Sequence, residues 1–200
     1  MQTRSIGDLR LASGQTLTDV QIAYVSHGTL APDGRNAVLV THGYTSGPSM
    51  LSTGHHTAEG SWAPLLGPGR PLDTDRFFVV CSNMLGSSFG STGPSSTNPA
   101  TGRPWGPDFP RIVLADIVAA QHALLQRLGV QHLRAVVGPS YGGFQALQWA
   151  LDHPAMVDAC GVVVSGLHTP GGLDAASARA KYADHADWHD GWHYGHDGIR

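Results

Sequence analysis

The pentapeptide Gly-Pro-Ser-Tyr-Gly at residues 138–142 constrains the fold of this chain more than any other feature. It has the form G-x-S-x-G; a short apolar run at residues 132–137 precedes it, and a helix-forming run at residues 142–151 follows. A strand, a sharp turn and a helix are the setting in which this pentapeptide presents a serine as a nucleophile. Glycines on both sides of the serine allow a tight turn and keep bulk away from its hydroxyl group. We therefore expect Ser140 to be a nucleophile rather than an ordinary serine at a helix start.

Four short runs of the sequence are apolar at nearly every position. They lie at residues 37–41, 77–82, 133–137 and 159–164. Such runs indicate strands covered on both faces, as in a parallel sheet. Residues 114–128 carry apolar side chains and Gln121 on one helical face, which predicts a helix that Gly129 ends. This order of elements predicts an α/β sheet with crossover helices, and residues 8–17 and 20–25 add a hairpin at one edge.

Composition limits the number of domains and the kinds of partner. With 200 residues, of which 41% are hydrophobic, the chain can form one globular domain with a sizeable core. A net charge of −3 and the lack of a basic run argue against nucleic acid as a partner, and no apolar run is long enough to span a membrane. No secretory signal is visible in the polar N-terminus. Cys81 and Cys160 lie in apolar runs, so we expect two buried free thiols, which suits a reducing cytoplasm.

Acyl transfer through a serine needs a base, an acid that orients the base, and N–H donors for the oxyanion. The N–H group of Tyr141 lies at the start of a predicted helix, where unpaired N–H groups and the helix dipole favour negative charge. The second donor usually comes from the loop after an earlier strand. Residues 42–44 directly follow the run at 37–41, so we expect this donor to be the N–H group of Tyr44. His42 is expected to shape the loop rather than to act as the base.

The C-terminal stretch is rich in histidine. His185, His189 and His193 are four residues apart, and His196 follows. On one helix this spacing could present a metal-binding face. The apolar residues of the stretch show no consistent periodicity, so we favour a loop or lid segment with incidental histidines and expect no metal. None of these histidines is expected to be the base, because in this class of enzyme the acid and the base follow later strands.

Four blocks of the sequence resemble homoserine O-acetyltransferases and their close relatives within the α/β-hydrolase superfamily. The blocks are residues 24–37, 83–99 and 140–149, and a final pattern of Arg179, Asp187, Trp188, Gly191 and Tyr194. The block at 83–99 (NMLGSSFGSTGPSSTNP) is the most specific. Composition alone would make it part of a flexible loop, whereas the resemblance implies that it belongs to the wall of the active site.

The resemblance implies an α/β-hydrolase fold with a mostly parallel sheet, truncated after the strand at 159–164. It implies a core over residues 1–165 and the start of an incomplete lid over residues 166–200. It also implies an enzyme of methionine biosynthesis in the cytoplasm, with small-molecule substrates and a full-length form compatible with a homodimer. An acetyl group would pass from acetyl-CoA, a substrate rather than a bound cofactor, through Ser140 to the hydroxyl of L-homoserine or a similar acceptor. Arg179 would bind the acceptor's carboxylate, which a guanidinium group matches in shape and charge.

The chain also departs from the family pattern. The family's H-A-L-T-G and G-G-S-M-G-G read H-G-Y-T-S at residues 42–46 and G-P-S-Y-G-G at 138–143, so a tyrosine stands at both oxyanion positions. The backbone N–H donors do not depend on the side chain and are retained, but the side chains that line the pocket differ from those of the family. Ala115 and Ala119 stand where the acetyltransferases commonly carry arginines. The family's catalytic aspartate and histidine match nothing in the 200 residues.

Three hypotheses therefore remain open from the sequence. The first is an acetyltransferase of the homoserine type, and the second is a serine esterase that uses water as the acceptor. The third is a truncated chain that lacks its base and acid and is not an enzyme as it stands. This last hypothesis predicts an exposed apolar edge of the sheet.

Overall fold

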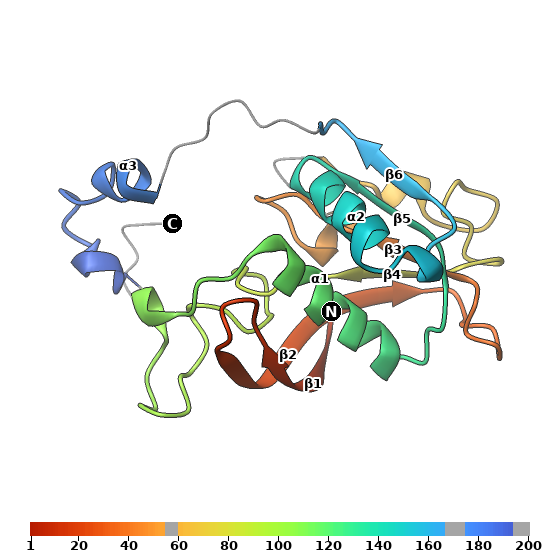
Figure 1. Ribbon diagram of the computed structural model, residues 1–200. Helices are drawn as coiled ribbons and strands as arrows, with labels where there is room; N and C mark the ends of the chain where they lie inside the picture. Colours follow the sequence, from red (N-terminus) through yellow and green to blue (C-terminus); the bar gives the residue numbers. More distant parts are fainter. Residues whose placement is uncertain (55–59, 167–174, 194–200) are drawn as a thin grey trace.

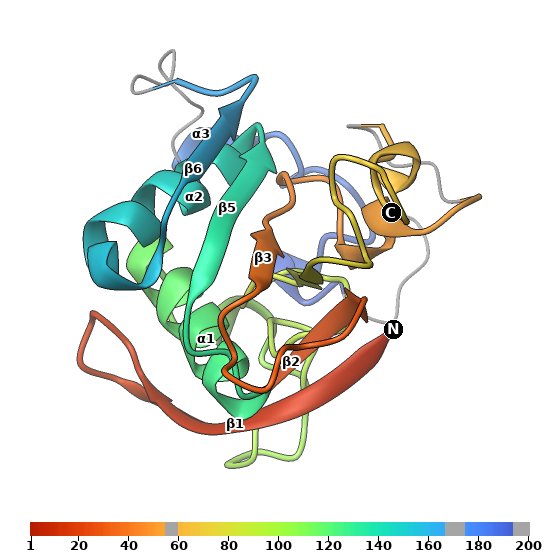
Figure 2. The same ribbon diagram turned by 90° about the vertical axis from the view of Figure 1, so that its right-hand side faces the viewer.

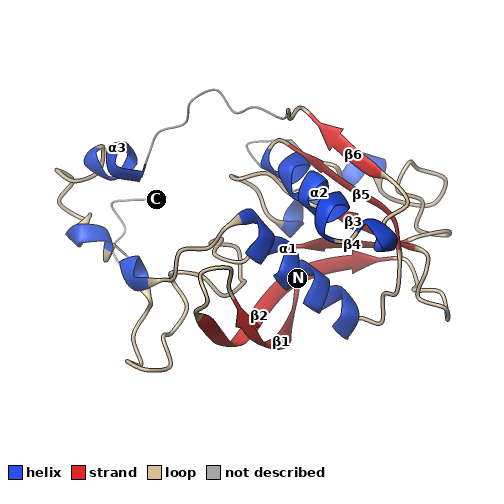
Figure 3. Cartoon of the chain, viewed as in Figure 1, coloured by secondary structure: helices blue, strands red, loops and turns tan. Residues whose placement is uncertain are grey.

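The structure of this chain is a computed structural model that describes residues 1–54, 60–166 and 175–193. At its centre is a six-stranded sheet with the order β1-β2-β4-β3-β5-β6 (Figure 1, Figure 3). The strands are β1 (Gln2–Arg10), β2 (Thr16–His27), β3 (Ala37–Val40), β4 (Phe78–Ser82), β5 (Leu133–Pro139) and β6 (Cys160–Val163). Strands β4, β3, β5 and β6 are parallel, whereas β2 is antiparallel to both β1 and β4. The predicted α/β sheet with a hairpin at one edge is confirmed.

Two helices cover one face of this sheet. They are α1 (Leu114–Arg127) and α2 (Tyr141–Asp152), which pack against each other (Figure 2). Alternate residues of the central strands point to this face, so that Leu39, Val80 and Val136 join the core beneath the helices. Val38, Val40 and Val79 point the other way, into a smaller core that Met50 and Leu51 also form. The central strands are therefore covered on both faces, as their continuous apolar runs predict.

The remaining helices are short. They are the 3-10 helices η1 (Pro48–Leu51), η2 (Ala63–Leu65), η3 (Gly106–Asp108), η4 (Pro154–Met156) and η5 (His189–Gly191), and the α-helix α3 (Ala175–Ala180). Gly129 has a φ of +85° and follows α1 closely, which confirms its predicted role in ending that helix. Within the described residues, no helix is both long and apolar enough to cross a membrane.

The turn of the N-terminal hairpin was predicted at the wrong place. Instead of lying between residues 17 and 20, it occupies residues 11–15, where the N–H group of Leu11 donates to the carbonyl oxygen of Gln15 at 2.8 Å. The polar pair Thr18-Asp19, which looks like a turn in the sequence, lies inside β2. Asp19 has a φ of +47° at a point where the register of β1 and β2 shifts. A β-bulge has the same polar signature as a turn, because both tolerate a left-handed residue.

Strand β6 is more exposed than its apolar sequence predicts. Val163 is 39% exposed and Val164, just after the strand, is 88% exposed. Cys160 is also exposed, so the prediction of two buried thiols is right for Cys81 and wrong for Cys160. The physical reason is position: β6 is the last strand of the sheet, and no described strand pairs with its outer edge. The exposed apolar edge that a truncated sheet predicts is present.

Candidate active site

Ser140 occupies a strained turn between β5 and α2. Its backbone angles are φ +52° and ψ −123°, a conformation that a residue other than glycine adopts only at a cost of about 1–3 kcal/mol. Two hydrogen bonds hold the turn: the N–H of Ser140 donates to the carbonyl oxygen of Val163 at 2.9 Å, and the N–H of Gly143 donates to that of Ser140 at 2.9 Å. The geometry is that of a nucleophile elbow, in which the serine hydroxyl stands clear of the helix that follows.

The glycines of the pentapeptide are required by packing against the end of β3. A Cβ atom added to Gly138 would lie 2.2 Å from the Oγ1 atom of Thr41, and one added to Gly142 would lie 2.4 Å from the carbonyl oxygen of Thr41. The hydroxyl group of Thr41 also donates to the carbonyl oxygen of Gly142 at 2.8 Å. Thr41 therefore brings the loop after β3 into direct contact with the first turn of α2.

This contact brings together the two residues expected to supply oxyanion donors. Tyr141 is the first residue of α2, where backbone N–H groups have no partner within the helix. The rings of Tyr44 and Tyr141 meet edge to face, with centroids 5.8 Å apart and an interplanar angle of 84°. In the described part of the chain, neither backbone N–H donates to another backbone group. Two unused donors thus lie on adjoining segments beside Ser140.

His42 is a structural residue of this loop. It is fully buried; its Nδ1 atom lies 2.8 Å from the carbonyl oxygen of Gly43, and its Nε2 atom lies 3.2 Å from the N–H of Met84. The N–H of Met84 can only donate, so Nε2 accepts and Nδ1 carries the proton. His42 thereby joins the loop after β3 to the loop after β4, which agrees with the role expected from the sequence.

A buried chain of amides supports the same loop from the helix side. The Nε2 atom of Gln145 donates to the carbonyl oxygen of His42 at 2.9 Å, and its Oε1 atom accepts from Gln121 at 2.7 Å. The Oε1 atom of Gln121 in turn accepts from the indole N–H of Trp149 at 2.7 Å. Sequence reasoning missed Gln145 and placed Gln121 only as part of an apolar face. A glutamine within such a face was the available signal, because a buried amide needs partners.

A cavity of about 590 Å³ lies against Tyr141, the residue that follows Ser140. Its walls are Tyr44 and Thr45 after β3, residues 84–89 after β4, Ile112 and Ile117 near the start of α1, and Tyr141. The segment after β4 is held in place rather than loose: the N–H of Thr92 donates to the carbonyl oxygen of Gln21 at 2.8 Å, and the N–H of Ala23 donates to the hydroxyl of Ser91 at 3.1 Å. The flexible-loop interpretation is therefore wrong, and the start of this segment forms a wall of the cavity.

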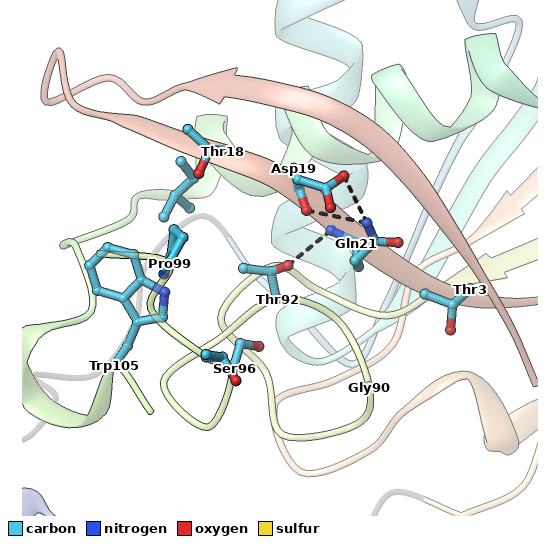
Figure 4. A pocket seen from close by; sticks show the side chains of 11 residues that line it. Thr3, Thr18, Asp19, Gln21, Gly90, Thr92, Ser96, Pro99 and Trp105 are labelled. Atoms are coloured by element: carbon cyan, nitrogen blue, oxygen red, sulfur yellow. Dashed lines mark hydrogen bonds between the residues drawn. The ribbon is translucent and has the colours of Figure 1, made fainter. Parts of the chain in front are cut away.

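A second cavity, of about 500 Å³, lies between the β1–β2 hairpin and residues 90–105 (Figure 4). Its lining includes Thr3, Asp19, Gln21 and Trp105. The Oδ1 atom of Asp19 accepts from the amide of Gln21 at 3.0 Å and from the hydroxyl of Ser5 at 2.7 Å. These polar groups of the cavity are therefore already hydrogen-bonded within the hairpin. Part of the block at residues 83–99 lines it, but Ser140, Tyr44, Tyr141 and Arg179 do not.

A family model described as alpha/beta hydrolase fold matches residues 36–189, which include β3, the elbow and α2. The chain belongs to the alpha/beta hydrolase fold family. It is 45% identical over 190 residues to the homoserine O-acetyltransferase of Rhodopseudomonas palustris (strain BisB18), a match that covers 93% of this chain and 47% of the relative. This alpha/beta hydrolase chain thus spans about half the length of the curated relatives it matches.

Two solved structures are also similar to this chain. The homoserine O-acetyltransferase from Bacillus anthracis superposes with a TM-score of 0.84 at 29% identity, covering 98% of this chain and 55% of that one. The esterase E22 superposes with a TM-score of 0.79 at 30% identity, covering 95% of this chain and 54% of that one. The family resemblance read from the sequence is confirmed, together with the fold class.

Other predicted residues of this alpha/beta hydrolase chain are not gathered at the elbow. Arg179 is exposed in the last turn of α3, which stands apart from the sheet in Figure 1. His185, His189 and His193 do not share one helix, and the described residues contain no group of three or more side chains that could hold a metal ion. Tyr194 and His196 lie outside the described residues. Within the described part of the chain, no side chain is hydrogen-bonded to the hydroxyl of Ser140.

Proposed function

We propose that this chain is the nucleophile-bearing half of a serine-dependent acyltransferase of the homoserine O-acetyltransferase type. The acyl donor is acetyl-CoA, which acts as a substrate, and the acceptor is the hydroxyl group of L-homoserine or a similar small molecule. The observation that carries the proposal is the strained backbone of Ser140 at the start of α2, beside the unused N–H groups of Tyr44 and Tyr141. The 45% identity to a homoserine O-acetyltransferase supports the choice of acceptor class.

The reaction has two steps. The hydroxyl oxygen of Ser140 attacks the thioester carbon and loses its proton to a base, while the backbone N–H groups of Tyr44 and Tyr141 bind the oxyanion. Collapse of the tetrahedral intermediate releases the thiol of CoA, which takes up the proton, and leaves acetyl-Ser140. The acceptor hydroxyl then attacks this ester, its proton passes to the base, and Ser140 recovers a proton as the O-acetyl product leaves. The base and its orienting acid belong to the part of the enzyme beyond the described residues.

The remaining assignments complete the proposal. Arg179 anchors the acceptor's carboxylate when the lid that begins at residues 166–200 folds over the core of residues 1–165. A guanidinium group exposed on α3 is free to make such a bidentate contact. The enzyme works in the cytoplasm on small molecules, and its full-length form is a homodimer. The reduced cysteines Cys81 and Cys160 agree with that compartment.

The test is a reaction with acetyl-CoA followed by intact-mass analysis, with and without homoserine. In the enzyme that includes the base and the acid, we expect an acetyl adduct on Ser140 that is absent from Ser140→Ala, and conversion of homoserine to its O-acetyl ester. An adduct that persists in Ser140→Ala would reject the nucleophile. If the 200-residue chain forms no adduct with acetyl-CoA or with a fluorophosphonate, the chain is catalytically incomplete as it stands, which is the third hypothesis raised by the sequence.

A serine esterase is the second candidate, and the superposition on esterase E22 favours it. Both activities share acetyl-Ser140 and differ only in the acceptor, water or an amino-acid hydroxyl. Product analysis separates them: free acetate as the sole product in the presence of homoserine supports the esterase and excludes the transferase.

A further inference from the structure

The cavity against Tyr141 is walled mainly by apolar side chains. Its apolar lining is Met84, Leu85, Ile112, Ile117 and Phe89, of which Phe89 is 41% exposed, and Thr45, Ser87 and Ser88 add hydroxyl groups to it. Two glycines set these walls. A Cβ atom on Gly86 would lie 2.5 Å from the Cδ1 atom of Ile112, and one on Gly47 would lie 3.0 Å from the ring of Phe89. The side chains of Ile112 and Phe89 therefore pack directly against the backbone of Gly86 and Gly47, and this packing keeps the cavity open.

The two tyrosines form the side of the cavity nearest the nucleophile. Tyr44 is 74% exposed, whereas Tyr141 is half-buried, and the edge-to-face contact between them joins the two oxyanion segments. Burial, with a smaller contribution from Tyr44, raises the pKa of Tyr141, so its phenol stays neutral at physiological pH. An acyl group attached to Ser140 would meet neutral aromatic and aliphatic surfaces here rather than charges.

The size of the cavity exceeds what an acetyl group needs. A water molecule takes up about 30 Å³ of liquid volume, and an acetyl group is only a few times larger. The cavity, at about 590 Å³, falls within the range of pockets that enclose a small organic ligand. An apolar chain of several carbons would fill it and bury its methylene groups against Phe89, Ile112 and Ile117.

We infer that this cavity binds the apolar chain of an acyl donor, and that the site takes neutral acyl groups of about four to eight carbons more tightly than acetyl. The inference rests on the proposed function, because it takes the cavity to be the acyl side of the Ser140 site. Each fully buried methylene group strengthens binding roughly fourfold. Because the rim is open to solvent, we expect at least about a tenfold preference for hexanoyl over acetyl.

The experiment is a calorimetric titration of the 200-residue chain with three S-acyl-N-acetylcysteamine thioesters: acetyl, hexanoyl and succinyl. Hexanoyl should bind at least about tenfold tighter than the other two, because acetyl buries fewer methylene groups and the lining residues that the structure describes include no cation to pair with the carboxylate of succinyl. If the cavity instead holds the thiol arm, or nothing, the three affinities will be equal or unmeasurable, and either result overturns the inference.

Two variants and a control sharpen the test. Phe89→Ser should weaken hexanoyl binding about tenfold and leave acetyl binding unchanged. Leu65→Ser, at a comparably exposed leucine outside the cavity, should change neither. If Phe89→Ser does not fold, Thr45→Arg decides: a cation at the lining should raise the affinity for succinyl relative to hexanoyl, and an unchanged ratio overturns the inference.

Binding requires neither base nor acid, so this experiment can fail independently of the proposed function. A preserved chain-length preference without any acetyl-Ser140 rejects only the acyltransferase. Acetylation of Ser140 with equal binding of all three thioesters rejects only the assignment of the cavity.

Discussion

Replacement of Gln145 by methionine tests whether the buried amide chain holds the loop after β3. Methionine has nearly the same volume and suits a helix, so the change removes hydrogen bonds with little change in packing. Gln145 is fully buried, and its amide bonds to the carbonyl oxygen of His42 and to the amide of Gln121. In Gln145→Met, the carbonyl oxygen of His42 loses this donor and the amide nitrogen of Gln121 loses its acceptor.

The size of the effect follows from these two groups. A buried donor or acceptor left without its partner costs about 1–3 kcal/mol. Two such groups, one on each side of Gln145, should lower the free energy of unfolding by about 3 kcal/mol, allowing for some relaxation of the site. A second expectation concerns coupling. Because Gln121 and Gln145 share one bond, the double variant Gln121→Met/Gln145→Met should lose less stability than the two single variants added together.

Urea unfolding followed by circular dichroism measures these changes, with the slope against denaturant checked for constancy. Gln148→Met is the matched control on the same helix. The amide of Gln148 bonds only to the exposed carboxylate of Asp152 at 2.9 Å, so this variant should stay within about 0.5 kcal/mol of the parent. A Gln145→Met protein as stable as the Gln148→Met protein would refute the idea that the amide chain supports the loop after β3.

Three further predictions concern the elbow and a histidine pair. Ser140→Gly should raise the free energy of unfolding by about 1 kcal/mol, because glycine relieves the strain at φ +52°; an unchanged or lowered urea midpoint would contradict the strain. Gly142→Ala should lower the free energy of unfolding by about 2 kcal/mol or more, since its Cβ would lie 2.4 Å from the carbonyl oxygen of Thr41. An unchanged free energy of unfolding would mean that the backbone shifts to relieve this contact. The rings of His122 and His153 stack 4.2 Å apart, and burial lowers the pKa of both. Just below the ordinary histidine pKa of about 6.5, the unfolded chain therefore binds protons more readily than the folded chain. Stability should therefore fall as the pH drops from about 7.5 to about 5.5, and His153→Asn should flatten that dependence; equal slopes for parent and variant would exclude the pair as its source.

The elbow could be predicted from the sequence because its chemistry is local. Ser140 is flanked by glycines that a strand-to-helix turn requires, and the apolar run at 37–41 fixes which loop lies beside it. The interior strands could also be predicted, since burial on both faces leaves continuous apolar runs in the sequence.

What could not be predicted depends on neighbours distant in the chain. Thr18 and Asp19 resemble a turn, and only pairing with β1 makes them a bulge. The apolar residues of β6 do not reveal that the strand lies at an edge, because exposure depends on which strand pairs with it. Gln145 becomes meaningful only when α2 places it against His42, which is 103 residues earlier.

The bond from Ser140 to β6 makes the amide proton of Ser140 a reporter of local opening. That proton is held by the carbonyl oxygen of Val163, at the end of a strand whose outer edge and valines are exposed. Edge strands with few buried contacts open well before the whole molecule unfolds. In a hydrogen-exchange experiment, the Ser140 amide should therefore exchange with the amides of β6 rather than with those of the neighbouring interior strand β3. The strained elbow would then share the dynamics of this edge strand, so any chain that pairs with β6 would also stabilise the turn at Ser140.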